Sequence, residues 1–333
     1  MLIPKPLRDV KTRKMDRRRL IKGMALTAIG ALVESASPGI APAFAQTVKA
    51  KKGFQATSWN HISRSGYDDV KSRDFYVDLF GMECTWYTPE GGCEIDFGEL
   101  DAINDGDRDS IFIRKVGSNA KPSVDHLAFS VEHFDLDEAE AIIKSFGYTY
   151  KYDGKIMWTV LDPDGYVAQP GSKIGNFPGG IKPGSSQYPG FKDLYTMPHP
   201  LQPLLPFPEH SLKSIGAVVS LKVTDVAKSR NFYRDFLGLK VSAEKPDACF
   251  LRFGRHDGLL LSKSEKGDNK TYADHLTIIV TNKLEFVESE LQRRNLNAQK
   301  DSQAPAYTFV DLDGITVKVA GPDILEGKMG FVA

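Results

Sequence analysis

An internal repeat constrains the fold of this chain more than any other feature of its sequence. Three landmarks occur twice and in the same order: KSRDFYVDLFG at 71–81 and KSRNFYRDFLG at 228–238, Asp-His-Leu at 125–127 and 274–276, and DPDG at 162–165 with DLDG at 311–314. The offsets are 157, 149 and 149 residues. A period of this length is far longer than the unit of a solenoid, so the sequence predicts a duplicated domain.

Each copy follows the order strand, helix and then three strands, and does so twice. The first copy predicts strands at 60–65, 83–87, 93–97 and 110–116, with a helix at 69–80 that Gly81 closes as its C-terminal cap. The pattern restarts with a strand at 126–131, a helix at 136–146, and strands near 148–152, 157–161 and 167–169. The chain is therefore predicted to be an α+β protein of four βαβββ modules, two in each copy.

Paired modules of this kind, with a His near the first strand and DPDG before the last, resemble the vicinal oxygen chelate (VOC) superfamily. This superfamily includes glyoxalases, bleomycin-resistance proteins and extradiol ring-cleaving dioxygenases. The resemblance implies two tandem domains, at 56–170 and 213–323, and a connector at 171–212 that is rich in Pro and Gly. Because the superfamily carries several chemistries and simple binding on one scaffold, the fold alone does not specify a reaction.

The resemblance also implies a metal site in the first domain. Dioxygenase members hold the ion with two His and a Glu on the first and last strands, leaving positions open for substrate and oxygen. By residue-to-residue correspondence, the two His are His61 and His126, and the carboxylate position is Gln169, four residues after the Gly of DPDG. The neutral Gln departs from the family pattern, because it leaves the charge of a divalent ion less compensated.

Two further sources are open for the missing anionic ligand. One is a carboxylate on or after the third strand, namely Glu94, Asp96 or Glu99, and the other is the chelating substrate itself. Fe(II) or Mn(II) is expected for oxygen chemistry, while Zn(II) and Ni(II) also fit such donors. Candidates for the apolar wall of the substrate site are Trp59, Phe129 and Trp158.

The second copy departs further from a metal site. Val218 occupies the position of His61, and Lys318 occupies the position of Gln169, so only His275 remains. A cation beside a single imidazole disfavours a divalent ion. We therefore expect one metal per chain, held in the first domain.

The leading functional hypothesis is an exported, metal-dependent enzyme of the dioxygenase or glyoxalase type that acts on a small organic substrate chelated through vicinal oxygens. The competing hypothesis is a binding protein of the same fold, in which His61 and His126 are core histidines and an aromatic compound is sequestered without chemistry. The sequence identifies neither the substrate nor the oligomeric state.

The N-terminal 45 residues read as an export signal. Asp16-Arg17-Arg18-Arg19-Leu20-Ile21-Lys22 resembles the twin-arginine signature, an uncharged stretch at 23–33 follows, and Ala43-Phe44-Ala45 fits a cleavage site. This implies the twin-arginine export machinery as a partner and a periplasmic or secreted mature protein.

The charge distribution argues against nucleic acid as a partner. Residues 1–45 carry nine Lys or Arg and three Asp or Glu, which leaves 34 basic and 40 acidic residues in the rest of the chain. Nucleic-acid binding needs clustered cations that neutralise phosphates, so a mildly acidic body disfavours it. No uncharged apolar run reaches the roughly 18 residues that a transmembrane helix needs.

The three cysteines form no metal-binding or disulfide pattern. Cys84 and Cys93 flank a turn signal, so two alternatives are open: a disulfide across a hairpin that forms after export, or two free thiols.

Overall fold

The computed structural model describes residues 52–326, except for 89–91, 102–106, 118, 153–157, 172–209, 266–272 and 303. The predicted signal at 1–45 and nearly all of the predicted connector lie outside the described residues. Among the described helices, none is long and apolar enough to cross a membrane.

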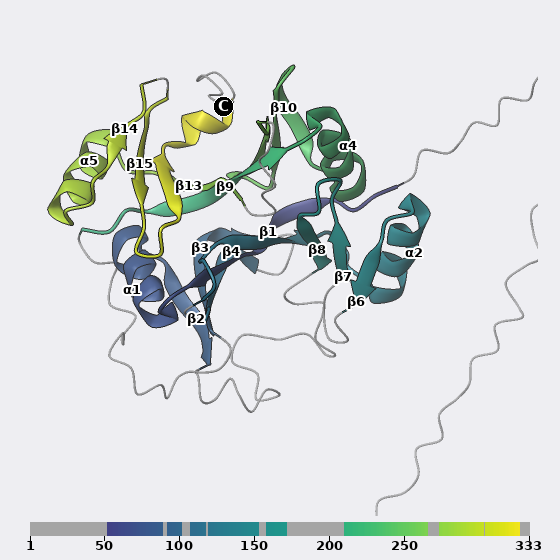
Figure 1. Cartoon of the computed structure of the whole chain (residues 1–333), viewed down its shortest axis with the longest axis horizontal. Helices are drawn as coiled ribbons and strands as arrows, with labels where there is room; N and C mark the ends of the chain where they lie inside the picture. Colours follow the sequence, from purple (N-terminus) through teal and green to yellow (C-terminus); the bar gives the residue numbers. More distant parts are fainter. Residues whose placement is uncertain are drawn as a thin grey trace, which may run out of the picture. The chain divides into compact units, whose positions relative to one another are not determined.

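Two mixed sheets of eight strands each form the described part of the chain (Figure 1). The first sheet has the order β2-β3-β4-β1-β5-β8-β7-β6, and the second repeats it as β10-β11-β12-β9-β13-β16-β15-β14. In each sheet the two first strands of the modules pair antiparallel at the centre, and each pairs in parallel with the last strand of its own module. The predicted α+β arrangement of four βαβββ modules is confirmed.

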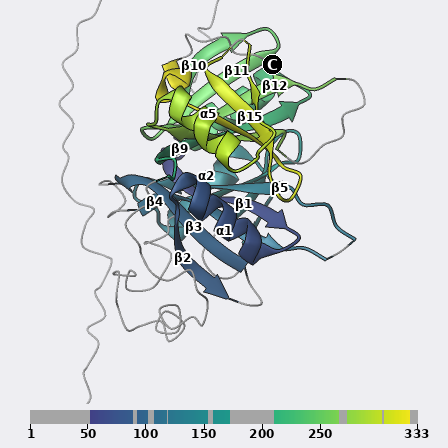
Figure 2. The same ribbon diagram turned by 90° about the vertical axis from the view of Figure 1, so that its left-hand side faces the viewer.

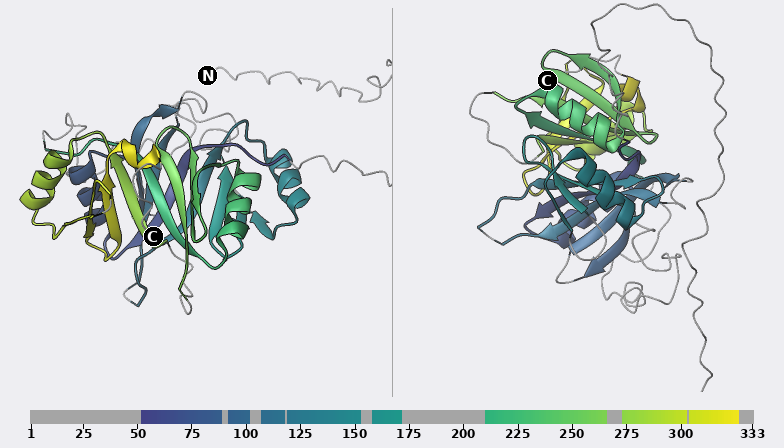
Figure 3. Two further views of the ribbon diagram at one scale, coloured as in Figure 1. Left: turned by 90° about the horizontal axis from the view of Figure 1, so that it is seen from above. Right: turned by 90° about the vertical axis from the view of Figure 1, so that its right-hand side faces the viewer.

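The elements of the first half are β1 (Ala56–Gly66), α1 (Asp69–Phe80), β2 (Glu83–Thr88), β3 (Gly92–Asp101), β4 (Asp107–Lys115), β5 (Val124–Val131), α2 (Leu136–Phe146), β6 (Tyr150–Tyr152), β7 (Trp158–Leu161) and β8 (Val167–Gly171). Those of the second half are β9 (Ser214–Val223), α4 (Val226–Leu237), β10 (Lys240–Lys245), β11 (Ala248–Phe253), β12 (Asp257–Lys263), β13 (His275–Val280), α5 (Leu284–Arg293), β14 (Gln299–Lys300), β15 (Ala306–Val310), β16 (Thr316–Ala320) and the 3₁₀ helix η1 (Pro322–Glu326). Figures 2 and 3 show the same sheets and helices from three further directions.

The helices begin and end where local signals predict. At the start of α1, the side chain of Asp68 accepts a hydrogen bond from the backbone N–H of Lys71, and Gly81 ends the helix in the left-handed region with φ 63°. Helix α4 has the same pair of caps, Asp225 and Gly238. Helix α2 spans the predicted residues 136–146.

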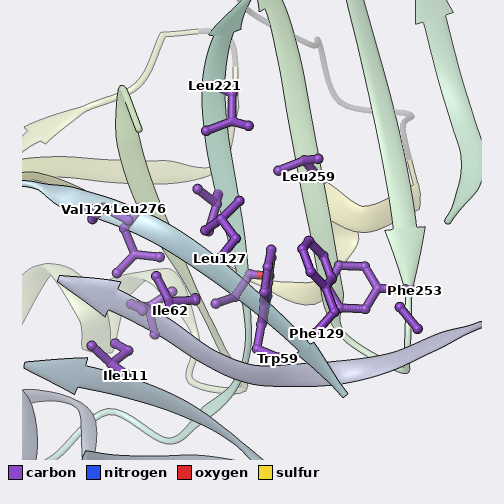
Figure 4. Close-up of a cluster of buried hydrophobic side chains, with 14 of the residues drawn as sticks. Trp59, Ile62, Ile111, Val124, Leu127, Phe129, Leu221, Phe253, Leu259 and Leu276 are labelled. Carbon is purple, nitrogen blue, oxygen red and sulfur yellow. The ribbon is translucent and has the colours of Figure 1, made fainter. Parts of the chain in front are cut away.

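The main core joins the two halves (Figure 4). Trp59 of β1 is fully buried, packs against Phe129 of β5 and Phe253 of β11, and donates its indole N–H to the carbonyl of Ala217 over 3.0 Å. Buried aliphatic residues of both sheets surround these rings, including Ile62, Leu127, Leu221, Leu259 and Leu276. The halves therefore share one core.

The repeated motifs hold the halves together reciprocally. The DLDG turn of the second half accepts hydrogen bonds from α1: Tyr76 donates to Asp311 over 2.9 Å and Ser72 to Asp313 over 2.5 Å. The corresponding donors on α4, Tyr233 and Ser229, reach Asp162 and Asp164 of the DPDG turn over 3.0 and 2.9 Å. The Ser and Tyr of each KSRxFY segment thus contact the acidic turn of the other half.

Of the two alternatives for Cys84 and Cys93, the structure has the reduced thiols and not the disulfide. The register of β2 and β3 places Cys84 opposite Ile95 and Cys93 opposite Tyr87, and neither forms a disulfide. Burial raises the pKa of the Cys93 thiol.

Candidate metal centre

Two predicted ligands meet on one face of the first sheet. His61 comes from β1 and His126 from β5, and their Nε2 atoms lie 3.0 Å apart. Two nitrogen ligands about 2.1 Å from an ion and at right angles to each other would lie about 3.0 Å apart. The spacing is therefore that of two neighbouring ligands of one ion.

The two rings differ at Nδ1: His61 has a hydrogen-bond acceptor there, whereas the carboxylate oxygen beside His126 accepts no hydrogen bond from the described residues. Nδ1 of His61 lies 3.1 Å from Oδ1 of Asn60, and Nδ1 of His126 lies 3.1 Å from Oδ1 of Asp125. An amide oxygen only accepts hydrogen bonds, so the His61 ring carries its hydrogen at Nδ1 and turns the lone pair of Nε2 toward His126. The 3.0 Å between the two Nε2 atoms is a hydrogen-bond distance, and it also fits two nitrogens that face one cation.

His126 is suited to be a neutral ligand. Burial, followed by the positive charge of Arg114, lowers its pKa to about 4. Arg114 also forms an ion pair with Asp125, whose other carboxylate oxygen lies 3.1 Å from Nδ1 of His126. A metal must compete with a proton for an imidazole nitrogen, so the low pKa keeps this nitrogen available.

Strand β1 contains a β-bulge directly before His61. Trp59 pairs with Phe129 and His61 with Ala128, so two steps along β1 match one step along β5. Asn60 is the extra residue. In the second sheet, Ala217 and Val218 pair with Ile278 and Thr277 without such a shift.

Gln169 lies on the same face as the two imidazoles. It is the neighbour of Ala128 in the parallel register of β5 and β8, and its amide donates to the hydroxyl of Thr159 over 3.0 Å. The amide oxygen is then the atom that remains for an ion or a substrate. The described residues contain no group of three His, Cys, Asp or Glu that could hold a metal, so a three-ligand set here needs Gln169.

The first module supplies one ligand only. Gln169 lies beside the residue two places after His126, and the residue in the matching position of the first module is Phe112, beside Ser63. The ring of Phe112 lies 5.9 Å from that of His61. Glu94 pairs with Phe112 from β3, and its Oε1 lies 2.7 Å from the Ser110 hydroxyl oxygen, whose hydrogen is donated to the shorter contact, the carbonyl of Asn60. A phenyl ring therefore occupies the position that would correspond to a fourth ligand. The side chain of Glu99, one of the carboxylates considered as a ligand, lies outside the described residues.

The three predicted wall residues need correction, because all of them lie on the opposite face of the sheet. The bulge turns Trp59 away from His61, and Phe129 follows His126 by three residues, an odd number that reverses the face. Trp158 precedes Thr159, the partner of Gln169, and packs instead against Tyr152 at a ring distance of 4.7 Å. These rings build the core and not the substrate site.

On the equivalent face of the second sheet, an apolar cluster takes the place of His61. Val218, in the position of His61, belongs to a buried cluster with Phe250, Ile279 and Leu325 of η1. His275 keeps an acceptor at Nδ1, Asp274 Oδ2 at 3.0 Å, and Lys318 lies 3.6 Å from Asp301. This face presents one imidazole and a lysine where the first presents two imidazoles and an amide.

Asn60, Asp125 and Phe112 are the site residues that sequence reasoning missed. A signal for the first two exists in the sequence, because an Asx residue precedes each strand His: Asn60-His61, Asp125-His126 and Asp274-His275. No such signal marks Phe112, whose place follows from strand register.

Comparison with solved structures identifies the fold. A Mn(II)-bound glyoxalase from Novosphingobium aromaticivorans superposes with a TM-score of 0.56 at 14% identity, covering 83% of this chain and 84% of that one. The protein has the vicinal oxygen chelate fold. Homoprotocatechuate 2,3-dioxygenase from Arthrobacter globiformis gives 0.54 at 17% identity, covering 83% and 81%, and a 2,3-dioxygenase from Pseudomonas sp. KL28 gives 0.54 at 12%, covering 82% and 93%.

No protein-family model matches this sequence, and neither does any curated protein sequence. At these identities the structural likeness establishes the fold and leaves the reaction to the site itself.

Proposed function

We propose that the protein is a metal-dependent enzyme of the VOC type, dioxygenase-like or glyoxalase-like, acting on a small organic substrate chelated through vicinal oxygens. The observation that carries the proposal is the pair of Nε2 atoms at 3.0 Å on one face of the sheet, with Gln169 beside them. Asn60 accepts from Nδ1 of His61, so Nε2 of His61 faces His126 without a hydrogen of its own.

His61 and His126 would hold the ion, and Gln169 would be the third ligand or a hydrogen-bonding partner of the substrate. A bound divalent ion would polarise two adjacent oxygens of the substrate and orient them. Phe112 offers no ligand atom, and its phenyl ring, 5.9 Å from the His61 ring, would be an apolar neighbour of a bound ion.

Fe(II) or Mn(II) is the proposed metal, with Zn(II) and Ni(II) as alternatives. The Mn(II)-bound state of the structurally similar glyoxalase supports a divalent ion. With a neutral amide in place of the family carboxylate, an anionic substrate oxygen would supply the missing negative charge.

The second candidate is a binding protein that sequesters an aromatic compound without chemistry. The observation in its favour is that the described residues offer no cluster of three His, Cys, Asp or Glu. Under this proposal the imidazole pair shares a proton instead of a metal.

Metal analysis of the purified mature protein tests both proposals. We expect close to one equivalent of a divalent metal, and less than about 0.2 equivalents would support the binding protein instead. His61→Ala and His126→Ala should each abolish metal content and turnover, whereas His275→Ala should change neither by more than about twofold. Metal lost in His275→Ala and retained in His61→Ala would show that the active half is the second.

We also propose export by the twin-arginine route to the periplasm or beyond. The signature around Arg17 and Arg18 supports it, and folding in the cytoplasm would let the chain take up its metal before it meets competing ions. Replacing both residues with Lys should leave precursor in the cytoplasm. Unchanged export would refute the route.

A further inference from the structure

Asn60 is an additional residue that the first half carries and the second half lacks. Trp59 and Ala217 are equivalent, because each donates its backbone N–H to an Asp of the last strand in its module, Asp109 over 2.9 Å and Asp257 over 3.1 Å. In the second half, the residue directly after Ala217 is Val218, which takes the position of His61. The insertion therefore stands immediately before the metal ligand.

The inserted residue is buried, and its backbone carbonyl and both polar atoms of its side chain form hydrogen bonds. Asn60 is 2% exposed, its carbonyl accepts a hydrogen bond from the Ser110 hydroxyl over 2.6 Å, and its amide nitrogen donates to Ser130 over 3.4 Å. What remains is the amide oxygen, which lies 3.1 Å from Nδ1 of His61. A buried Asn fixed at three points holds its oxygen in one place.

We propose that Asn60 is the positioning residue of the metal site, a role that rests on the proposed function. Its amide oxygen holds the hydrogen of His61 at Nδ1 and fixes the ring, so that Nε2 is turned toward Nε2 of His126 with its lone pair free. A His whose Nδ1 has no acceptor can place its hydrogen on either nitrogen, and the Nε2–H form cannot bind a metal through that atom.

The test compares Asn60→Leu, which keeps the size and removes the acceptor, with Asn60→Asp, which keeps the acceptor. Mn(II) and Zn(II) affinities are measured by competition with a chromophoric chelator. We expect Asn60→Leu to weaken binding by about 10- to 100-fold, the usual effect of losing such a partner. Asn60→Asp should bind at least as tightly as the unaltered protein. The matched control is Asp274→Ala, which removes the same kind of acceptor from His275 and should leave the affinity unchanged.

A second measurement uses the metal-free protein. Nitrogen-15 NMR of the imidazole rings distinguishes Nδ1–H from Nε2–H, so His61 should be in the Nδ1–H form in the unaltered protein and in Asn60→Asp. In Asn60→Leu, a substantial Nε2–H population should appear. Thermal unfolding of each variant verifies that it is folded.

The outcomes distinguish a failure of this inference from a failure of the proposed function on which it rests. An affinity within threefold of the original in Asn60→Leu, or an equal loss in both Asn60 variants, would overturn the positioning role. If the unaltered protein binds no metal, the proposed function fails, and the NMR comparison still decides whether Asn60 sets the tautomer of His61.

Discussion

Arg64 offers the most demanding test of how the two halves depend on each other. Its side chain is fully buried, and its Nη1 lies 2.7 Å from Asp311, while its Nη2 pairs with Asp313. The guanidinium also lies over the ring of Tyr76, 4.9 Å from the ring centroid. One cation from β1 of the first half thus serves two carboxylates of the second half.

The second half of the repeat shows which residue can take the position of Arg64. In the second half, Leu221 occupies the position of Arg64, and Asp162 and Asp164 of the first half's acidic turn accept hydrogen bonds from Tyr233 and Ser229. Arg64→Leu leaves Asp311 and Asp313 buried without their cation, although hydrogen bonds from Tyr76 and Ser72 remain. Removing one partner of a buried ion pair costs about 3–5 kcal/mol of unfolding free energy, and we expect a loss in this range.

Urea unfolding of Arg64→Leu at pH 8 and pH 5 measures this loss. The loss should be smaller at pH 5, because a buried carboxyl without a counter-charge takes up a proton more readily. Asp162 shows this in the present structure, where burial raises its pKa to about 6. Arg230→Leu is the control: it breaks a partly exposed pair with Glu244, which should contribute about 1 kcal/mol or less. A loss below about 1 kcal/mol in Arg64→Leu would refute the argument that this cation compensates the two carboxylates.

Three further perturbations test the charges and the metal site. The raised pKa of Asp162 means that the folded chain binds this proton more tightly than the unfolded chain, so stability from this group is lost as pH rises from about 4 through 6, by up to about 3 kcal/mol. Asp162→Asn should remove that loss in urea unfolding at several pH values, and an unchanged pH profile would contradict it. The lowered pKa of His126 has the opposite sign: in the metal-free protein, its contribution is complete above about 6.5 and is lost as pH falls toward 4. His126→Gln should therefore flatten the acid side of the profile, and a profile that keeps its slope would argue against a neutral buried ring. Gln169→Glu restores the family carboxylate and should tighten metal binding by about tenfold or more, measured by chelator competition; an unchanged affinity would place Gln169 outside the ligand set.

Much of the fold was accessible from the sequence because its signals are local. Helix ends depend on residues within one turn, so Gly81 and Gly238 mark the ends of α1 and α4 in sequence and structure alike. The duplicated KSRxFY segment and the acidic turns fix the module order. The two His at the first strands also lie on one face, with Gln169 beside them.

What the sequence alone could not provide is strand register and contact between distant segments. Alternation by two would place Trp59 and His61 on one face, and only the pairing of β1 with β5, 70 residues away at Asn60 and Ser130, shows that a bulge separates them. The position of Phe112, on the other side of the two imidazoles from Gln169, likewise depends on which strands become neighbours.

The sequence by itself determined the four modules, the glycine caps of α1 and α4 and the pair of imidazoles, since each depends on residues close together in the chain or on a motif that repeats. The tertiary structure decided which side chains surround those imidazoles and how the halves join. In the sequence the acidic turns predict only loops. In the structure they accept hydrogen bonds from the other half, and Arg64 donates to Asp311, which is 247 residues away in the sequence. Contacts over such separations follow from the packing of the two sheets, which no local pattern specifies.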